Sequence, residues 1–524
     1  MASFDVIIKN GTVYDGVSSE PRLLDIGISG KEIKAIDKLS GANAGRIIEA
    51  DSKFVTPGFV DIQNHSDSYL TLLEIPSQDS LVAQGITTVA VGQCGTSLAP
   101  LVSPEALKSI QKWHSLAGAN LNWLTFEEYF RALKDYPLGV NVLSLVGHST
   151  MRRGLLRDEV RPATKEEILI MERLLRESLE AGAAGCSLGL VYAHEVDTGQ
   201  EELLSVAKII GEHQKLLSVH LRSEGRHVID AINEVVEFGQ VRGAKFKISH
   251  FKVRGKQNWP AVEEALAILD RAYQKGVDIF FDVYPYTTSW TVLYTYLPKW
   301  AYEGGRQNIL QNIKNPATRE KILAYLKSSE LNLAQVFIAT SETNSAFIGK
   351  NLAEISANQE ISIEQALLNV LAATQAQVIA FDHNLSEDVL EILLKHPLSI
   401  VGSDGAGYDY HFSPAHGLIH PRCFGTFPKF LQMVREKKIM TWDAAIRKIT
   451  SRPAEKLGLH KRGVLKPGNF ADIVVFDPYA VGSPASYENP YQEPDGIDYV
   501  FVNGKLAYQA HGEQNEQAGE ILRI

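Results

Sequence analysis

Nine short apolar runs, separated by segments with helical periodicity, occupy roughly residues 56–455 and restrict the fold more than any other feature. The runs are GFVDIQNH, GITTVAVGQCG, VNVLSLVGH, GAAGCSLGL, LLSVHLRSE, KFKISHFK, DIFFDVYPY, QVFIAT and LSIVGSDG. Strand and helix segments that alternate in this way predict parallel strands with crossover helices, and the length suits a (β/α)8 barrel with insertions. A doubly wound open sheet is the alternative, but no GxGxxG follows the first strand and no P-loop is present.

The two ends of the chain have a different character. Short strand-like segments with turn dipeptides such as Asn10-Gly11, Gly30-Lys31 and Asn503-Gly504 predict antiparallel hairpins. We therefore expect residues 1–58 and 456–524 to form one small β domain around a catalytic barrel at 59–455.

One connection is unusually long. Residues near 285–345 contain many aromatic side chains and then a helical run. Such an insertion is either a lid that excludes water from the site or an extra pair of packing helices.

Composition narrows the class of function. A formal net charge of -10 and a pI near 5.9 argue against a nucleic-acid or anionic-membrane binder. Three cysteines in a long chain do not form a disulfide framework and favour a reducing compartment. Since neither a signal peptide nor a run of about 18 apolar residues is visible, we expect a cytoplasmic protein with small-molecule substrates. The sequence carries no signal for an oligomeric state.

Most of the predicted strands end in a polar residue. These residues are His65, Asp67, Cys94, His148, His220, His250, Asp282, Tyr284 and Asp404. His220 and His250 end consecutive predicted strands, so their imidazoles should enter one site. A single histidine at a strand end is more often a satisfied polar group, but catalytic groups of barrels collect at these ends. The ring as a whole therefore predicts a hydrolytic metal site.

Cys94 completes a candidate ligand set. It follows an apolar run and precedes a glycine, so its sulfur should reach the barrel mouth. A thiolate and two imidazoles favour Zn²⁺, with one coordination position left for water. Without His220 and His250, Cys94 would be taken for a small buried hydrophobe. We expect Cys186 to pack in the core and Cys423 to be structural.

Asp404 in SIVGSDG is the candidate general base and acid. A carboxylate there can take a proton from the attacking water and later give it to a leaving amine. Zinc lowers the pKa of bound water to about 7, which makes hydroxide available at neutral pH. The alternative is an Asx-type turn before Gly405.

Several of these motifs occur together in one known family. TPGFVDIQNHSD, GITTVAVGQCGTSLAP, VHLRSEG, KISHFK, DVYPYT, GSDG and HPRCFGTF resemble the N-acyl-D-amino-acid deacylases (D-aminoacylases) of the amidohydrolase superfamily. PGNFADIVVFDP near the C-terminus extends the resemblance over nearly the whole chain. It implies a distorted TIM barrel, a small β domain made from both termini, and hydrolysis of N-acyl-D-amino acids to a carboxylate and a free D-amino acid.

The resemblance also implies roles for individual residues. It places a tightly held zinc ion on Cys94, His220 and His250 and makes Asp404 the general base and acid. It assigns the substrate carboxylate to Lys252, Tyr284, Ser289 and Arg422. An arginine fork and a lysine suit a carboxylate, although either could instead be a solvated surface charge.

One departure from the superfamily pattern concerns the metal. The first barrel strand usually ends in His-x-His, whereas this chain has Gln63-Asn64-His65. A neutral amide oxygen is a poorer zinc ligand than imidazole, so we expect one tightly bound zinc ion and an impaired second position. His65 and Gln63 should then bind water or the substrate acyl group, and His65 should help to hold the oxyanion. The resemblance also implies that Cys94 is the additional metal ligand, in the role that a carboxylated lysine has in dihydroorotase-like relatives.

Two other functions stay open at this point. The chain could hydrolyse cyclic amides, or N-acyl amino acids and dipeptides of other chirality, but Lys252 and Arg422 favour a substrate with a free carboxylate. It could also be a non-catalytic amidohydrolase-like binding protein. The intact set of Cys94, His220, His250 and Asp404 favours the enzyme.

Overall fold

The computed structural model of the chain describes residues 3–109, 120–157, 159–329, 331–341, 344–410, 417–512 and 516–524. Eight strand positions in these ranges form a parallel barrel. They are β6 (Phe59–Asp61), β7 (Ile86–Val91), β8 (Asn141–Ser144) continued by β9 (Val146–Gly147), β10 (Gly185–Gly189), β11 (Leu216–His220), β12 (Lys245–Ile248), β13 (Ile279–Val283) and β17 (Ser399–Val401). A parallel bridge between Asn64 and Gly405 closes the ring.

The barrel strands are buried on both faces, which explains their continuous apolar runs. All five residues of β11 and all five of β13 are buried. Amphipathic crossover helices cover the outside; they include α5 (Lys165–Glu180), α6 (Gln200–Glu212), α7 (Val228–Phe238), α8 (Ala261–Gln274), α14 (Glu387–Lys395) and α15 (Arg422–Lys437). A capping box of Thr164 and Glu167 fixes where α5 begins.

The prediction that QVFIAT is a barrel strand is wrong. This run forms β15 (Val336–Thr340), which pairs antiparallel with β16 (Ile379–Asp382) beside β14 (Ser289–Val292) in a separate small sheet. A five-residue apolar run has the same pattern in a parallel barrel and in a buried antiparallel sheet, so the sequence does not distinguish them.

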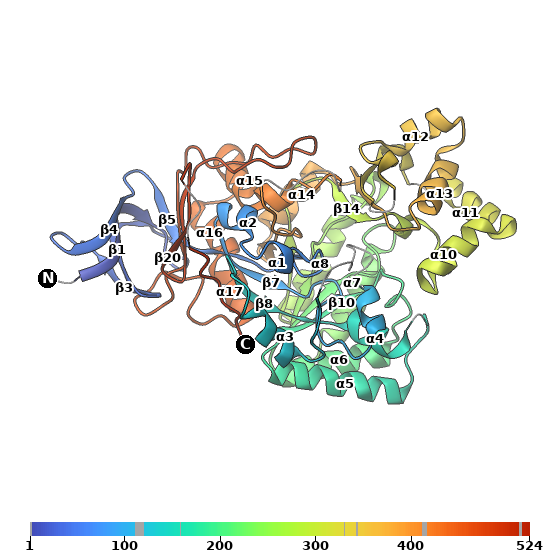
Figure 1. Cartoon of the computed structure of the whole chain (residues 1–524), viewed down its shortest axis with the longest axis horizontal. Helices are drawn as coiled ribbons and strands as arrows, with labels where there is room; N and C mark the ends of the chain where they lie inside the picture. The colour runs from blue at the N-terminus through green and yellow to red at the C-terminus, as the bar shows by residue number, and fades with distance from the viewer. Residues whose placement is uncertain are drawn as a thin grey trace.

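The small sheet carries its own helices, and its apolar core continues into barrel residues such as Tyr69, Tyr192 and Phe424. The helices are α9 (Lys299–Tyr302), α10 (Gly305–Lys314), α11 (Pro316–Ser328), α12 (Leu352–Gln359) and α13 (Ile363–Ala373). Figure 1 shows this insertion at one end of the molecule, and its sheet ends only at Asp382, beyond the predicted limit of 345. Residues 330, 342 and 343 of the predicted segment lie outside the described residues.

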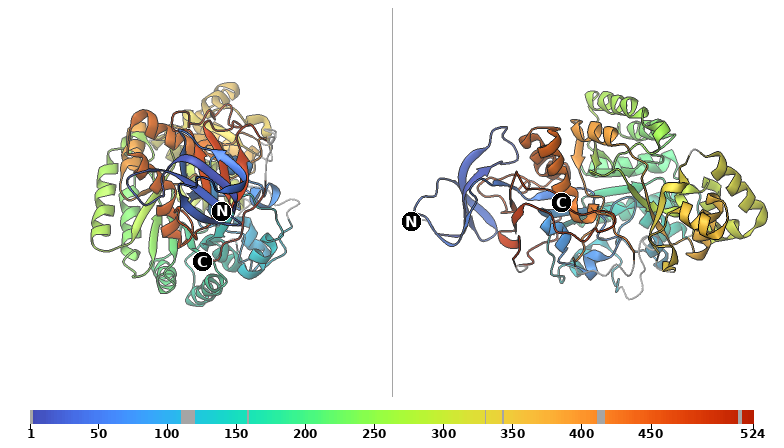
Figure 2. Two further views of the ribbon diagram at one scale, coloured as in Figure 1. Left: turned by 90° about the vertical axis from the view of Figure 1, so that its left-hand side faces the viewer. Right: turned by 90° about the horizontal axis from the view of Figure 1, so that it is seen from above.

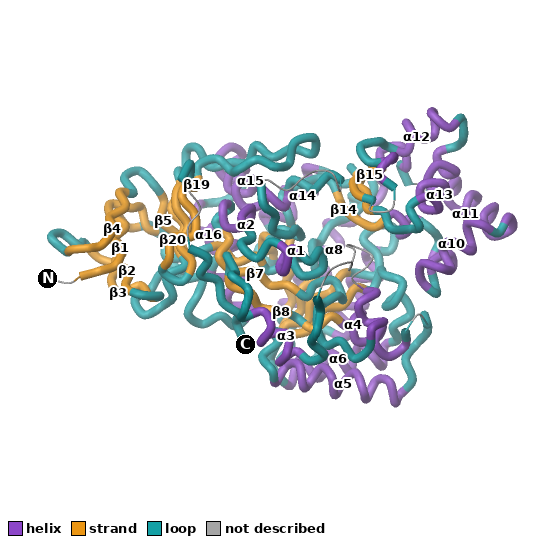
Figure 3. The backbone as a smooth tube through the Cα atoms, viewed as in Figure 1, coloured by secondary structure: helices purple, strands orange, loops and turns teal. Residues whose placement is uncertain are grey.

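The opposite end of the molecule is a β sheet built from both termini. Its strands are β1 (Ser3–Val13), β2 (Arg22–Ser29), β3 (Glu32–Asp37), β4 (Asn43–Glu49), β5 (Phe54–Pro57), β18 (Ile473–Phe476), β19 (Ile497–Val502) and β20 (Lys505–Gln509). N-terminal β5 pairs antiparallel with C-terminal β18, and the blue and red strands lie side by side in Figures 1 and 2. In Figure 3 these orange strands and the purple helices of the insertion lie at opposite ends of the barrel.

Two of the three predicted hairpin turns are confirmed. Gly30-Lys31 joins β2 to β3, and Asn503-Gly504, with φ values of 50° and 78°, joins β19 to β20. Asn10-Gly11 instead forms a bulge within β1, where the register with β2 shifts. An asparagine with positive φ serves a bulge as well as a turn. No helix in the described ranges is long and apolar enough to cross a membrane.

Candidate active site

Cys94, His220 and His250 meet at the carboxyl ends of the barrel strands. One ligand atom from each lies within 4.8 Å of the others, and all three residues are buried. Cys94 Sγ is 3.3 Å from His250 Nε2, and the two imidazole centroids are 4.4 Å apart. The structure therefore brings together the three residues that the sequence singled out as metal ligands.

Asp404 faces the same site from the end of the last barrel strand. Its Oδ1 is 3.1 Å from His65 Nε2, and its Oδ2 is 2.7 Å from Arg422 Nη1. The closure of the barrel produces this arrangement, because Asp404 N donates to Gln63 O and His65 N donates to Gly405 O. His65, Cys94 and Asp404 form a second set whose donor atoms lie within 4.8 Å of one another.

Three of these residues have backbones in the left-handed region. The φ angles are +52° for Cys94, +37° for His250 and +51° for Asp404. This conformation costs a non-glycine residue on the order of 1 kcal/mol, and such residues cluster at functional sites. The barrel rim thus holds these side chains at angles that a regular strand would not give.

Nearby positive charges favour the anionic forms of Cys94 and Asp404. Burial by itself would raise the pKa of the Cys94 thiol, but the charge of His250 and hydrogen bonds from imidazoles hold that pKa well below its ordinary value. Burial would likewise raise the pKa of Asp404, whereas Arg422, His250 and His65 hold it well below the usual range. A thiolate and a carboxylate are therefore available at neutral pH.

The chemistry of the donors fits a zinc ion. His220 Nδ1 is buried and has no hydrogen-bond partner among the described residues, which is the state of a nitrogen reserved for a metal. Glu224 Oε1 lies 3.1 Å and Lys252 Nζ 2.8 Å from His250 Nδ1, and these contacts orient the ring so that its Nε2 faces Cys94 Sγ at 3.3 Å. One thiolate and two imidazoles are the donors that zinc prefers.

A narrow pocket opens above these donors. It is lined by His65, Tyr69, Cys94, Val191, Tyr192, His220, Glu224, His250, Lys252, Arg254, Tyr284, Ser289, Trp290, Thr291, Thr295, Asp404 and Arg422. The insertion contributes Ser289, Trp290, Thr291 and Thr295, so it forms one wall. The cavity measures about 40 Å³, enough for only a few waters, and side chains must move to admit a larger ligand.

The four residues predicted to hold a substrate carboxylate all line this pocket. The Arg422 guanidinium carbon lies 5.0 Å from the centre of the Tyr284 ring. Arg422 Nε and Tyr284 Oη are buried without hydrogen-bond partners among the described residues. Lys252 Nζ donates to Glu224 Oε1 at 2.6 Å, and Ser289 Oγ lies 3.4 Å from both Asp382 O and Asn384 Oδ1. Arg422 and Tyr284 therefore have donors left for a ligand.

A sequence comparison identifies the family. Residues 46–508 match the sequence model of the amidohydrolase family. The chain belongs to the amidohydrolase family. This membership confirms the superfamily that the strand-end motifs predicted.

Relatives place this amidohydrolase near one branch of the family. It is 31% identical to a D-aminoacylase and 33% identical to an N-acyl-D-glutamate deacylase, both of Alcaligenes xylosoxydans xylosoxydans. The alignments cover 99% of this chain and 97% and 96% of the two relatives. These values confirm the predicted resemblance to the D-aminoacylases.

A solved structure agrees over the whole chain. The N-acyl-D-glutamate deacylase of Bordetella bronchiseptica, crystallised with zinc and a phosphonate inhibitor, has a TM-score of 0.85 and 31% identity. All of both chains is covered. The comparison confirms the predicted fold class, a distorted TIM barrel with a small β domain.

Several residues of the amidohydrolase site were not identified from the sequence. Glu224 contacts both His250 and Lys252, and its position in the VHLRSEG motif was the available signal. Lys247 is completely buried and ion-pairs with Asp282 at 3.1 Å. Gln63, by contrast, was predicted from the sequence to bind water or the substrate acyl group, but it lies outside the pocket lining, with its Nε2 3.5 Å from Asp404 Oδ1 and its Oε1 accepting from Lys247 Nζ.

Other members of the predicted ring serve the scaffold of the amidohydrolase. Asp67 accepts from Gly92 N at 2.9 Å, and Asp282 Oδ2 accepts from His250 N at 3.0 Å. Cys186 and Cys423 are buried. His148 does not join the donor sets; its ring lies between Glu195, at 2.7 Å, and Glu202, at 2.9 Å.

The pairing of His148 predicts a pH dependence of stability. Burial would lower its pKa, but hydrogen bonds to Glu195 and Glu202 raise that pKa to about 9, above the unfolded value of about 6.5. The imidazolium then contributes stability that is complete below about pH 6.5 and is lost as pH rises through about 9. The wild-type melting temperature should fall over this interval more steeply than that of His148→Gln. His227→Gln, at an exposed histidine, should keep the wild-type slope. Parallel curves for wild type and His148→Gln would contradict the assignment.

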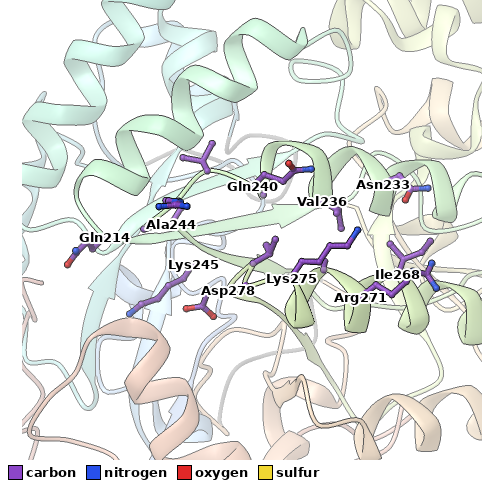
Figure 4. A pocket seen from close by; sticks show the side chains of 17 residues that line it. Gln214, Asn233, Val236, Gln240, Ala244, Lys245, Ile268, Arg271, Lys275 and Asp278 are labelled. Atoms are coloured by element: carbon purple, nitrogen blue, oxygen red, sulfur yellow. The ribbon is translucent and has the colours of Figure 1, made fainter.

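A larger groove lies at the other end of the barrel and carries no comparable chemistry. It measures about 750 Å³ and lies between α7 and α8 (Figure 4). Its lining includes Lys245 and Asp278, which stand at the amino ends of β12 and β13. His250 follows the carboxyl end of β12, so the groove opens on the opposite face from the donor sets. Barrel enzymes place their chemistry at the carboxyl ends.

Proposed function

We propose that this amidohydrolase is a zinc-dependent hydrolase that cleaves the amide bond of N-acyl-D-amino acids into a carboxylate and a free D-amino acid. The observation that carries the proposal is the placement of unsatisfied donors of Arg422 and Tyr284 in the same pocket as Asp404 and the Cys94, His220 and His250 set. A carboxylate clamp beside a hydrolytic metal set suits a substrate whose amide lies one carbon from a carboxylate. The names of the relatives support the same substrate class.

Cys94, His220 and His250 would hold the tightly bound zinc ion. When bound, zinc polarises the acyl carbonyl and lowers the pKa of water to about 7. We expect one such ion per chain. The three free, buried cysteines support a cytoplasmic location, where thiols stay reduced.

Asp404 would move the proton of the reaction. Because its pKa is held low, it is ionised at neutral pH and can accept a proton from the attacking water. The water oxygen bonds to the acyl carbon, the carbon–nitrogen bond breaks, and Asp404 returns the proton to the departing amine. His65, 3.1 Å from Asp404, would donate to the oxyanion on the acyl carbon.

Stereochemical preference would follow from three fixed contacts. The acyl carbonyl meets the metal set, the carboxylate meets Arg422, Tyr284, Lys252 and Ser289, and the side chain takes the remaining direction. Exchanging D for L directs the side chain toward a wall of the pocket. Because the carbonyl and the carboxylate are both held, that exchange should lower kcat/KM by about 100-fold.

The test is amine release from matched N-acetyl-D- and N-acetyl-L-amino acids, with zinc measured in the same preparation. We expect release from the D panel, about one zinc ion per chain, and release that is about 1,000-fold slower from an Asp404→Asn preparation. Equal cleavage of the L panel would overturn the stereochemical assignment. Cleavage of cyclic amides alone would replace the substrate class, and zinc without turnover of any panel would favour a non-catalytic binding protein.

A further inference from the structure

The described residues offer two metal-ligand sets that share Cys94. The first is Cys94, His220 and His250, and the second is His65, Cys94 and Asp404. Thiolate, imidazole and carboxylate donors at these separations are chemically able to hold a second divalent ion. Whether a second ion binds therefore depends on the side chains that surround the second set.

The Gln63 amide nitrogen stands against all three donors of the second set. Its Nε2 is 3.3 Å from Cys94 Sγ, 3.4 Å from His65 Nε2 and 3.5 Å from Asp404 Oδ1. An ion at bonding distances of about 2.0 to 2.3 Å from these donors would contact this amide group. The side of the amide turned toward them carries two hydrogens and offers no lone pair.

Lys247 fixes the amide in this orientation. Its Nζ donates to Gln63 Oε1, donates to Ile62 O at 3.0 Å and ion-pairs with Asp282 Oδ1 at 3.1 Å. A lysine side chain has donors and no acceptor when charged, so it must face the amide oxygen. Both Lys247 and Gln63 are 0% exposed, so water cannot satisfy the groups if the amide turns over.

We infer that Gln63, oriented by Lys247, places its amide N–H group where a second ion would contact His65, Cys94 and Asp404. The chain therefore holds a single metal ion. In this arrangement Gln63 holds Cys94 and Asp404 by hydrogen bonds, where a second ion would hold them by coordination. From the sequence, a weak amide oxygen ligand was the expected cause of the impaired second metal position. The oxygen in fact faces Lys247, and the proton-bearing nitrogen blocks the set. The inference rests on the metal site of the proposed function and extends it to Gln63 and Lys247 as positioning residues.

Metal counting tests the inference without reference to activity. Wild-type protein is stripped of metal, loaded with a tenfold excess of ¹¹³Cd²⁺ and examined by cadmium NMR and by mass spectrometric metal analysis. We expect one resonance and one retained ion per chain. Gln63→Glu keeps an oxygen for Lys247 and turns a second oxygen toward the donors, so it should give two resonances and two ions. Lys247→Met frees the amide to turn its oxygen inward and should bind the second ion more weakly than Gln63→Glu.

Gln93→Glu is the matched control. Gln93 is another buried glutamine next to Lys247, at 3.3 Å, but its amide nitrogen donates to the Ile62 and Ala90 carbonyls. This variant should stay at one ion. A second ion in Gln93→Glu would mean that any new carboxylate near Lys247 binds metal. That result would contradict a specific role of Gln63.

The remaining outcomes separate this inference from the proposed function. Two retained ions in the wild type overturn the inference while leaving the first metal site in place. No retained ion overturns the metal site itself. One ion in both Gln63→Glu and Lys247→Met overturns the role of the amide. If neither variant folds, the cadmium titration of the wild-type protein still tests the inference. One resonance supports it, and a second resonance contradicts it.

Discussion

Asp404→Asn should lower kcat by about 1,000-fold while the bound zinc stays at the wild-type level, because removal of a general base and acid costs 10²- to 10⁴-fold. The amide has nearly the shape of the carboxylate but cannot accept the proton of water or return one to the amine. Asp404 lies outside the Cys94, His220 and His250 set, so the tightly bound ion should remain. Steady-state kinetics on the preferred N-acetyl-D-amino acid, with metal analysis of the same sample, measures both quantities.

Asp67→Asn is a matched control for this prediction. Asp67 is also a buried carboxylate that follows the first barrel strand, but it accepts from Gly92 N and does not line the pocket. Its substitution should leave kcat within a few-fold of the wild-type value in the folded protein. If Asp404→Asn retained zinc and full activity, the proton-transfer role of Asp404 would be excluded.

Cys94→Ala should remove both the metal and the activity. Cys94 supplies the only sulfur of either described donor set, and its thiolate offsets the charge of the ion. Loss of a residue that merely supports a ligand costs 10- to 100-fold in metal affinity, so loss of the ligand itself should cost more than about 100-fold. Dialysis against a weak chelator followed by metal analysis should leave far less than one ion per chain.

Cys186→Ala separates this effect from the general consequences of losing a buried thiol. Cys186 packs in the barrel core, and burial raises the pKa of its thiol well above the ordinary value. The variant should lose some stability because of the cavity but keep its zinc and its kcat. Retention of zinc by Cys94→Ala would show that Cys94 is not a ligand.

The parts of the site that lie at strand ends could be predicted from the sequence. His220 and His250 end consecutive parallel strands, and the geometry of a βαβ unit places them together without any knowledge of loops. Cys94 and Asp404 follow the same rule. The apolar runs behind them are long because the strands are buried on both faces.

The contacts beneath the site could not be predicted from the sequence in the same way. Lys247 reaches Gln63 across 184 positions, and no periodicity links an inward-facing lysine to a distant glutamine. His148 ends a strand like the ligands do, yet Glu195 and Glu202 take its ring away from the donor sets. The antiparallel sheet of the insertion was mistaken in part for the barrel, since QVFIAT has no feature that tells the two apart.

The pairing of β5 with β18 has a consequence for how the protein is made. Lys53, beside β5, meets Asp477, beside β18, and the two are 424 positions apart. At about 5 to 20 residues per second, a ribosome needs roughly 20 to 85 s to cover that interval. During this interval the edge of β5 that pairs with β18 is unpaired. An unpaired strand edge can pair with other chains. Substitutions in the N-terminal strands around β5 should therefore affect chaperone dependence and the yield of folded protein most strongly, although these strands lie far from the active site.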